Sequence, residues 1–139
     1  YKEWGIELKC EVQTFTACLA ELVESGKIKE AKTSKAYTFQ DPVHLARDIE
    51  ETEPARKIIS AFGENREMLL FGKDTMLGGN LIMNEYMPDV MRKVAEDRWI
   101  NAAGVNAETV VTASTADYVI MKSVKPEGVE IVTVEELVL

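Results

Sequence analysis

The sequence predicts an α/β fold, with a mostly parallel sheet of four to five strands and helices on both faces, in three layers as in Rossmann-like and flavodoxin-like domains. Two observations lead to this prediction. Short β-branched runs alternate with helical stretches along the chain, and such alternation favours parallel strands joined by crossover helices. The run at residues 108–113 is β-branched at its centre, which suits a fully buried parallel strand.

In the first half of the chain, residues 5–9 are predicted to form a strand and residues 12–24 a helix with one apolar face, which ends at Ser25 and Gly26. Residues 36–39 form the next predicted strand. Asp41 is expected to cap a helical turn that has Pro42 at its first position. Pro54 is expected to open a helix that runs to about residue 62.

The second half continues the alternation. The expected elements are a strand at residues 66–71, a loop at 72–79, a long helix at 84–103 with Pro88 in its first turn, a strand at 108–113, a helix at 116–123, a strand at 129–132 and a helical turn at 134–138. Three loops then follow strands, beginning near Asp41, Gly72 and Ser114. Because sites in such sheets lie at the carboxyl ends of the strands, these loops are expected to share one rim.

Charge and length restrict the function classes. The net charge of −8, from 24 acidic and 16 basic residues, argues against binding to nucleic acid or to an anionic membrane surface. No apolar run approaches the roughly 18 residues of a membrane span, so direct membrane insertion is not expected. The 139 residues fit a single domain, 1–139. Since the chain begins at Tyr1 rather than Met, it is interpreted as a piece of a longer protein. Two cysteines are too few for the disulfide scaffold of a secreted domain, so the expected compartment is the cytoplasm, and a parent protein peripheral to the membrane stays open.

Three segments carry recognisable motifs. Residues 41–47 read D-P-V-H-L-A-R, residues 65–79 read N-R-E-M-L-L-F-G followed by a glycine pair, and residues 111–117 read V-T-A-S-T-A-D. Together they resemble the three ligand-bearing loops of the cysteine-rich (CCG) domain, found in heterodisulfide reductases, anaerobic glycerol-3-phosphate dehydrogenase subunits and lactate- and glycolate-oxidising systems. The flanking residues 1–27 and 128–137 are also similar to that family, so the resemblance covers most of the chain.

In the family, the loops read D-P-C-H-L-x-R, N-R-E-x-x-C-C-G and V-T-x-C-P-x-C. The resemblance implies iron–sulfur redox chemistry, but every cysteine of the pattern is replaced here; the matching positions are Val43, Leu70, Phe71, Ser114 and Asp117. Clusters need soft thiolates, so no catalytic residue, metal or cofactor is expected in this domain. The large apolar replacements are expected to fill the space that a cluster would need.

Four rim residues are possible polar ligand contacts: Asp41, His44, Arg47 and Lys73. The simpler interpretation makes Asp41 a helix cap, Arg47 a surface charge, His44 a packed residue near a helix start and Asp117 a residue favoured by the helix dipole. The loop that holds Lys73 lacks the spacing of a phosphate-binding P-loop. The two cysteines, Cys10 and Cys18, are expected to be small buried hydrophobes. A residual metal site of His44, Asp117 and a cysteine stays open.

The predicted function is that of a C-terminal domain in an iron–sulfur oxidoreductase subunit that has lost its own cluster ligands and braces or docks a partner. The resemblance implies that the clusters lie elsewhere in the parent chain. It also implies that the partners are a ferredoxin-like segment, a second cysteine-rich domain or a flavoprotein subunit. The alternative is a small-molecule-binding or enzymatic module that uses the old rim, with His44, Lys73 and Asp117 as polar contacts.

Overall fold

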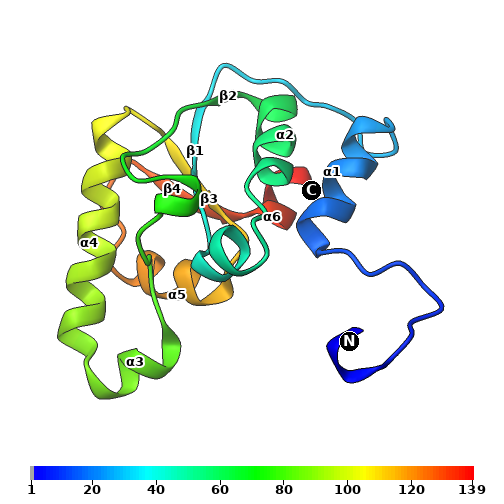
Figure 1. The fold of residues 1–139 in the computed structure, drawn as a ribbon. Coiled ribbons are helices and arrows are strands. Elements are labelled where there is room, and N and C mark those ends of the chain that lie inside the picture. Colours follow the sequence, from blue (N-terminus) through cyan, green and yellow to red (C-terminus); the bar gives the residue numbers. More distant parts are fainter. Residues whose placement is uncertain (1) are drawn as a thin grey trace.

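The computed structural model describes residues 2–139; Tyr1, the first residue of the stretch that resembles the family, lies outside them. Within this range the chain forms a four-stranded, all-parallel sheet in the order β2-β1-β3-β4 (Figure 1). The strands are β1 (Ala36–Gln40), β2 (Glu64–Asn65), β3 (Thr109–Thr112) and β4 (Glu130–Thr133). The predicted fold class is confirmed.

The strand register brings the loops together. Gln40 at the end of β1 pairs with Thr112 of β3, and Thr112 pairs with Thr133 of β4. The residues that follow β1 and β3 therefore emerge side by side at one edge of the sheet, as the parallel topology predicts.

Helices cover both faces of the sheet. On one face lie α1 (Phe15–Glu24), α2 (Glu53–Phe62) and α6 (Val134–Val138), around a core that contains Val111. On the other face lie α4 (Pro88–Gly104) and α5 (Thr115–Ser123), around a core that contains Val110. Successive residues of a strand point to opposite faces, so β3 is buried on both sides. This explains its β-branched composition.

The remaining elements lie outside these layers. They are α3 (Leu81–Tyr86) and three short helical segments: η1 (Lys2–Trp4), η2 (His44–Asp48) and η3 (Gly72–Asp74). Figure 1 shows α3 beyond the edge of the sheet at which α5 begins. No helix among residues 2–139 is long and apolar enough to cross a membrane.

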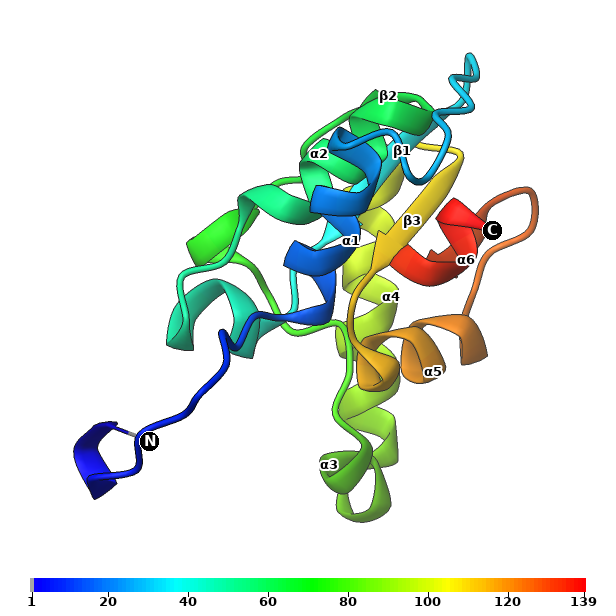
Figure 2. The same cartoon turned by 90° about the vertical axis from the view of Figure 1, so that its right-hand side faces the viewer.

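The predicted first strand is wrong. Residues 5–9 form no strand and lie in an exposed stretch that leads away from the sheet (Figure 2). Their apolar side chains Ile6 and Leu8 are 46% and 44% exposed. A strand needs a neighbour for its backbone and a core for one face, and this segment has neither. The helix that follows starts at Phe15 rather than at residue 12, because Thr14 caps it by accepting from Ala17 N at 3.0 Å.

Two boundaries also differ from the predictions. The strand expected at 66–71 is wrong: these residues form no strand, and the short β2 ends just before them at Asn65, followed by one more backbone hydrogen bond to β1, from Arg66 N to the carbonyl oxygen of Tyr37 at 2.8 Å. The long helix starts at Pro88, since Met87 (φ −140°, ψ 59°) separates it from α3. The other predicted helices and strands are confirmed to within about two residues, which is the usual uncertainty of such boundaries.

Candidate functional site

The centre of the rim is the carboxylate of Asp41, which is fully buried just after β1. It accepts two hydrogen bonds from Arg56 of α2, at 2.8 and 2.9 Å, and a third from the backbone N–H of Gly72 at 2.8 Å. One side chain of the first loop thus fixes the second loop and a helix. The expectation that Asp41 caps the helical turn is wrong, because its oxygens bind groups from distant segments and η2 has Val43 at its N-cap position.

Arg56 joins that carboxylate to a second one. Its Nε and Nη2 also donate to Glu67, at 2.8 and 2.9 Å, and its Nη1 donates to the carbonyl oxygen of Thr52. Burial lowers the pKa of Arg56, but the hydrogen bonds and charges of Asp41 and Glu67 outweigh burial and raise the pKa above its usual value. The guanidinium has used its donors within the chain, so it is poorly suited to bind an anion.

The other predicted polar contacts of the first two loops, which are His44, Arg47 and Lys73, have different surroundings from one another. Arg47 donates from Nε to the carbonyl oxygen of Lys73 at 2.9 Å, and it also bonds to the carbonyl oxygen of Thr75. Arg47 is therefore more than the surface charge that the sequence suggested, since it holds the second loop. Lys73 forms an exposed ion pair with Glu50 at 2.6 Å. His44 is exposed rather than packed.

The third loop is tied to the second by Asp117, which is 2% exposed in the first turn of α5. Its Oδ1 accepts from Gly78 N at 3.0 Å and from Gly79 N at 2.8 Å. Burial raises the pKa of Asp117 to about 6, although the bonds from Gly79, Gly78 and Ser114 oppose the shift. Ser114 caps α5 by accepting from Asp117 N at 3.2 Å. Asp117 lies where the helix dipole favours an acid, but its main contacts are with the glycine pair.

Sequence reasoning missed a polar pair beneath the second loop. Arg98 of α4 is fully buried and donates from Nε to Gln40 Oε1 at 2.7 Å and from Nη1 to the carbonyl oxygen of Leu69 at 3.1 Å. Gln40 Nε2 in turn donates to the carbonyl oxygen of Met76 at 2.9 Å. Burial lowers the pKa of Arg98. No sequence signal marks this arginine, because it lies among other charged residues of a helix.

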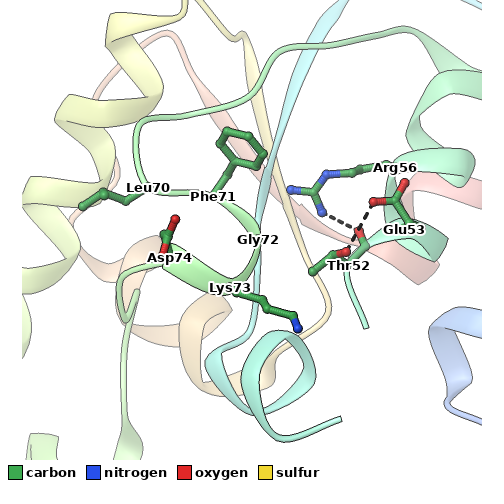
Figure 3. A pocket seen from close by; sticks show the side chains of 8 residues that line it. All are labelled: Thr52, Glu53, Arg56, Leu70, Phe71, Gly72, Lys73 and Asp74. Carbon is green, nitrogen blue, oxygen red and sulfur yellow. Dashed lines mark hydrogen bonds between the residues drawn. The ribbon is translucent and has the colours of Figure 1, made fainter. Parts of the chain in front are cut away.

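The apolar replacements do not fill the rim. Leu70 and Phe71 are 42% and 49% exposed, and only Val43 is half-buried. The expectation that these side chains occupy the space of a cluster is wrong for Leu70 and Phe71. Beside them lies an open cavity of about 380 Å³ (Figure 3), which is lined by Thr52, Glu53, Arg56, Leu70, Phe71, Gly72, Lys73 and Asp74. In Figure 3 the Phe71 ring and the Arg56 guanidinium lie next to each other, with Arg56 Cζ 5.7 Å from the centre of the ring.

An iron–sulfur cluster does not fit the donor set of this rim. The five positions that match family ligands carry no thiol, and Ser114 Oγ and Asp117 Oδ1 accept backbone N–H groups. The cysteines lie elsewhere: Cys18 is half-buried in α1, and Cys10 is exposed, contrary to the expectation of a buried residue. In the part of the chain that the structure describes, no three His, Cys, Asp or Glu side chains gather as a metal site.

This geometry defines a class of protein: a parallel α/β domain whose three loops are locked together by buried polar side chains at the carboxyl edge of the sheet. The sequence is similar to the D subunit of dihydromethanophenazine:CoB--CoM heterodisulfide reductase from Methanosarcina acetivorans, with 33% identity over 115 residues. The protein of the same name from Methanosarcina barkeri is 31% identical over 115 residues. We conclude that the chain is homologous to a segment of this heterodisulfide reductase polypeptide, which is part of an oxidoreductase.

The similarity covers most of this chain but only a small part of each relative. Each match covers 78% of this chain but 28% of the relative, so the chain spans little more than a quarter of the length of the curated relatives it matches. No protein-family model matches the sequence. No solved structure matches it significantly.

Proposed function

We propose that this chain is a cluster-free, cysteine-rich-type domain at the C-terminal end of an iron–sulfur oxidoreductase subunit, with a structural or subunit-docking role. The observation that carries the proposal is the chemistry at the five ligand-matching positions, which are Val43, Leu70, Phe71, Ser114 and Asp117. Three of these side chains have no lone pair to offer a metal, and the other two are engaged with backbone N–H groups.

The hydrogen bonds at the rim support a bracing role. The side chains that lie deepest there, Asp41, Arg98 and Asp117, all bind loop backbone or another buried side chain. Buried polar groups of this kind are costly to leave unpaired and make a structure specific when they are paired. Arg98 Nη2 is buried without a hydrogen-bond partner in the described residues, but the other bonds of these side chains hold the three loops together, and a fixed arrangement of loops suits a partner surface.

Electron transfer would then take place in other regions of the parent protein. The relatives are named as one subunit of a heterodisulfide reductase. By analogy, the partners of this domain are a ferredoxin-like segment or a second cysteine-rich domain of the parent chain, or a flavoprotein subunit. The acidic net charge of −8 is compatible with protein partners and unfavourable for nucleic acid.

The first experiment measures iron, acid-labile sulfide and visible absorption after anaerobic reconstitution of the chain. We expect a colourless, folded protein without stoichiometric iron, and stoichiometric iron would overturn the proposal. The matched variant restores the family ligands through Val43→Cys, Leu70→Cys, Phe71→Cys, Ser114→Cys and Asp117→Cys. If the motif alignment is right, this variant takes up iron and sulfide under the same conditions, because it recovers the thiolates that clusters need.

The cavity beside Phe71 favours a second candidate, a small-molecule-binding module. Of the predicted contacts, Lys73 lines this cavity, whereas Asp41, His44, Arg47 and Asp117 do not. A thermal-shift screen with small carboxylic acids and nucleotides tests this candidate, since a ligand of the native state raises the apparent stability. A shift that Lys73→Ala abolishes would favour the binding module over the bracing role.

A further inference from the structure

The cavity beside Phe71 has the size and the mixed lining of a small-molecule site. Its volume of about 380 Å³ falls in the range of cavities that bind small ligands. Two apolar side chains of its lining, Leu70 and Phe71, are 42% and 49% exposed, so they offer apolar surface to a ligand. The docking role leaves this cavity without an occupant, and the charges around it restrict what that occupant can be.

The two cations of the lining are engaged within the chain. The side chain of Arg56 is 12% exposed, and its five N–H donors bind two carboxylates and the carbonyl oxygen of Thr52. Lys73 pairs with Glu50 at 2.6 Å. An anion in the cavity would therefore have to compete with a carboxylate of the protein for either cation.

The two acids of the lining, Glu53 and Asp74, are not engaged in this way. Both side chains are exposed, and neither forms an ion pair within residues 2–139. Lys57, one turn along α2 from Glu53, is paired with Glu24. The lining and the ion-pair partners of its cations together hold five carboxylates and two cations. The potential in the cavity is therefore negative, which attracts a cation and repels an anion.

The aromatic ring of Phe71 favours the same class of ligand. Arg56 Cζ lies 5.7 Å from the centre of this ring, so the ring already takes part in one contact with a cation (Figure 3). The face of an aromatic ring attracts positive charge, and its apolar body packs against methylene groups. A ligand that joins a positive group to an alkyl chain would match both the acids and the apolar part of the lining.

We propose that this cavity binds an organic cation with an alkyl chain, of the class of the aliphatic amines. The positive group pairs with Glu53 or Asp74, and the methylene groups lie against Leu70 and Phe71. This inference goes beyond the docking role. It rests on the second candidate function, the small-molecule-binding module, and gives that module a ligand class opposite in charge to a carboxylic acid or a nucleotide.

Two probes of equal chain length and opposite charge test the proposal. They are cadaverine, a linear diamine, and pimelate, a dicarboxylate with the same number of methylene groups. Each is titrated into the 139-residue chain and followed by the amide signals in NMR spectra. We expect cadaverine to bind about tenfold more tightly than pimelate, or more, and to shift the signals of residues 70–74 most.

A pair of double variants shows whether the two acids are responsible. Glu53→Gln with Asp74→Asn should weaken the binding of cadaverine about tenfold, because two exposed ion pairs with the ligand are lost. Asp89→Asn with Glu135→Gln removes the same charge from exposed positions outside the cavity, so it should leave the affinity unchanged within about twofold.

The outcomes separate this inference from the proposed function. Tighter binding of pimelate, no saturable shift with cadaverine, shifts centred outside the cavity, or equal weakening in both double variants would overturn the organic cation. Pimelate binding that Lys73→Ala abolishes would keep the small-molecule-binding module and overturn its ligand class. The cluster-free docking role is judged separately by the iron and sulfide content of the chain, which neither probe affects.

Discussion

At the scale of single residues, two buried carboxylates determine how the three loops meet. Asp41 joins the first loop to the second, and Asp117 joins the second to the third. Both stand out in the sequence as positions of a family motif, but their partners do not. A side chain's type and its place beside a strand can be read from a sequence, whereas the backbone N–H group it binds about 30 to 40 residues away depends on how the loops fold.

The Asp41→Asn variant tests the first of these links. The substitution leaves the guanidinium of Arg56, which is only 12% exposed, without its buried carboxylate partner. Breaking a buried ion pair by removing one member costs about 3 kcal/mol or more when the other charge is left unpaired. Because Arg56 keeps its bonds to Glu67, we expect a smaller loss, of about 1.5–3 kcal/mol, in the free energy of unfolding measured with urea. The control is Asp89→Asn, whose pair with Arg92 is exposed and worth less than about 1 kcal/mol. Equal losses in both variants would contradict the role of Asp41.

The pH dependence of stability tests the second link. Burial raises the pKa of Asp117 from 3.8 to about 6. A raised pKa means that the folded protein binds the proton more tightly than the unfolded chain does. Stability therefore falls as the pH rises from about 4 to about 6, by up to about 3 kcal/mol from this group.

The Asp117→Asn variant should remove that part of the pH profile. The asparagine oxygen can still accept from Gly78 N and Gly79 N, and the buried charge is absent. We expect the free energy of unfolding of the variant to change less between pH 4 and pH 6 than that of the original protein. Superimposable profiles would show that another group controls the stability in this range.

At the scale of elements, the glycine pair lets the second loop lie against α5. A Cβ atom on Gly79 would come within 2.5 Å of Cβ of Ile120 and within 2.8 Å of the carbonyl oxygen of Ala116. Such a contact forces the loop and the helix apart. The glycine pair of the motif is thus explained by its close packing against a helix.

Gly79→Ala is expected to destabilise the protein by about 1–3 kcal/mol, the range for overpacking a close contact. Gly104→Ala is the matched control. A Cβ atom there meets nothing within 4 Å, and the residue lies at the end of α4, so this variant should be neutral or slightly more stable. Thermal unfolding of both variants measures the difference. A smaller effect for Gly79 than for Gly104 would contradict the close packing of loop and helix.

The elements predicted best are those whose pattern is local. The runs that became β1, β3 and β4 are apolar or β-branched, and the helices α2, α4 and α5 have capping or proline signals in the sequence. The predicted strand at residues 5–9 failed because its alternating Ile6 and Leu8 find no core to cover. A strand pattern describes a side-chain preference, and a neighbouring strand must still be present.

At the scale of the whole molecule, the sheet separates two cores and gathers the loops at one edge. The chain that forms this arrangement is homologous to a segment of a heterodisulfide reductase subunit. The three loops that carry the family motifs lie at this edge, and buried polar side chains hold them together. The exposed helix α3 extends past it in both views of the molecule (Figures 1 and 2).

The sequence by itself determined the parallel α/β class, the three loops at one edge and the lack of thiols at the motif positions, because each depends on residue type and order along the chain. Only the tertiary structure decided that Asp41 pairs with Arg56, that Arg98 is buried, that Leu70 and Phe71 are exposed and that α3 lies uncovered. These features depend on which distant segments meet. That choice is made by packing and by the pairing of most buried polar groups, and a local pattern does not contain it.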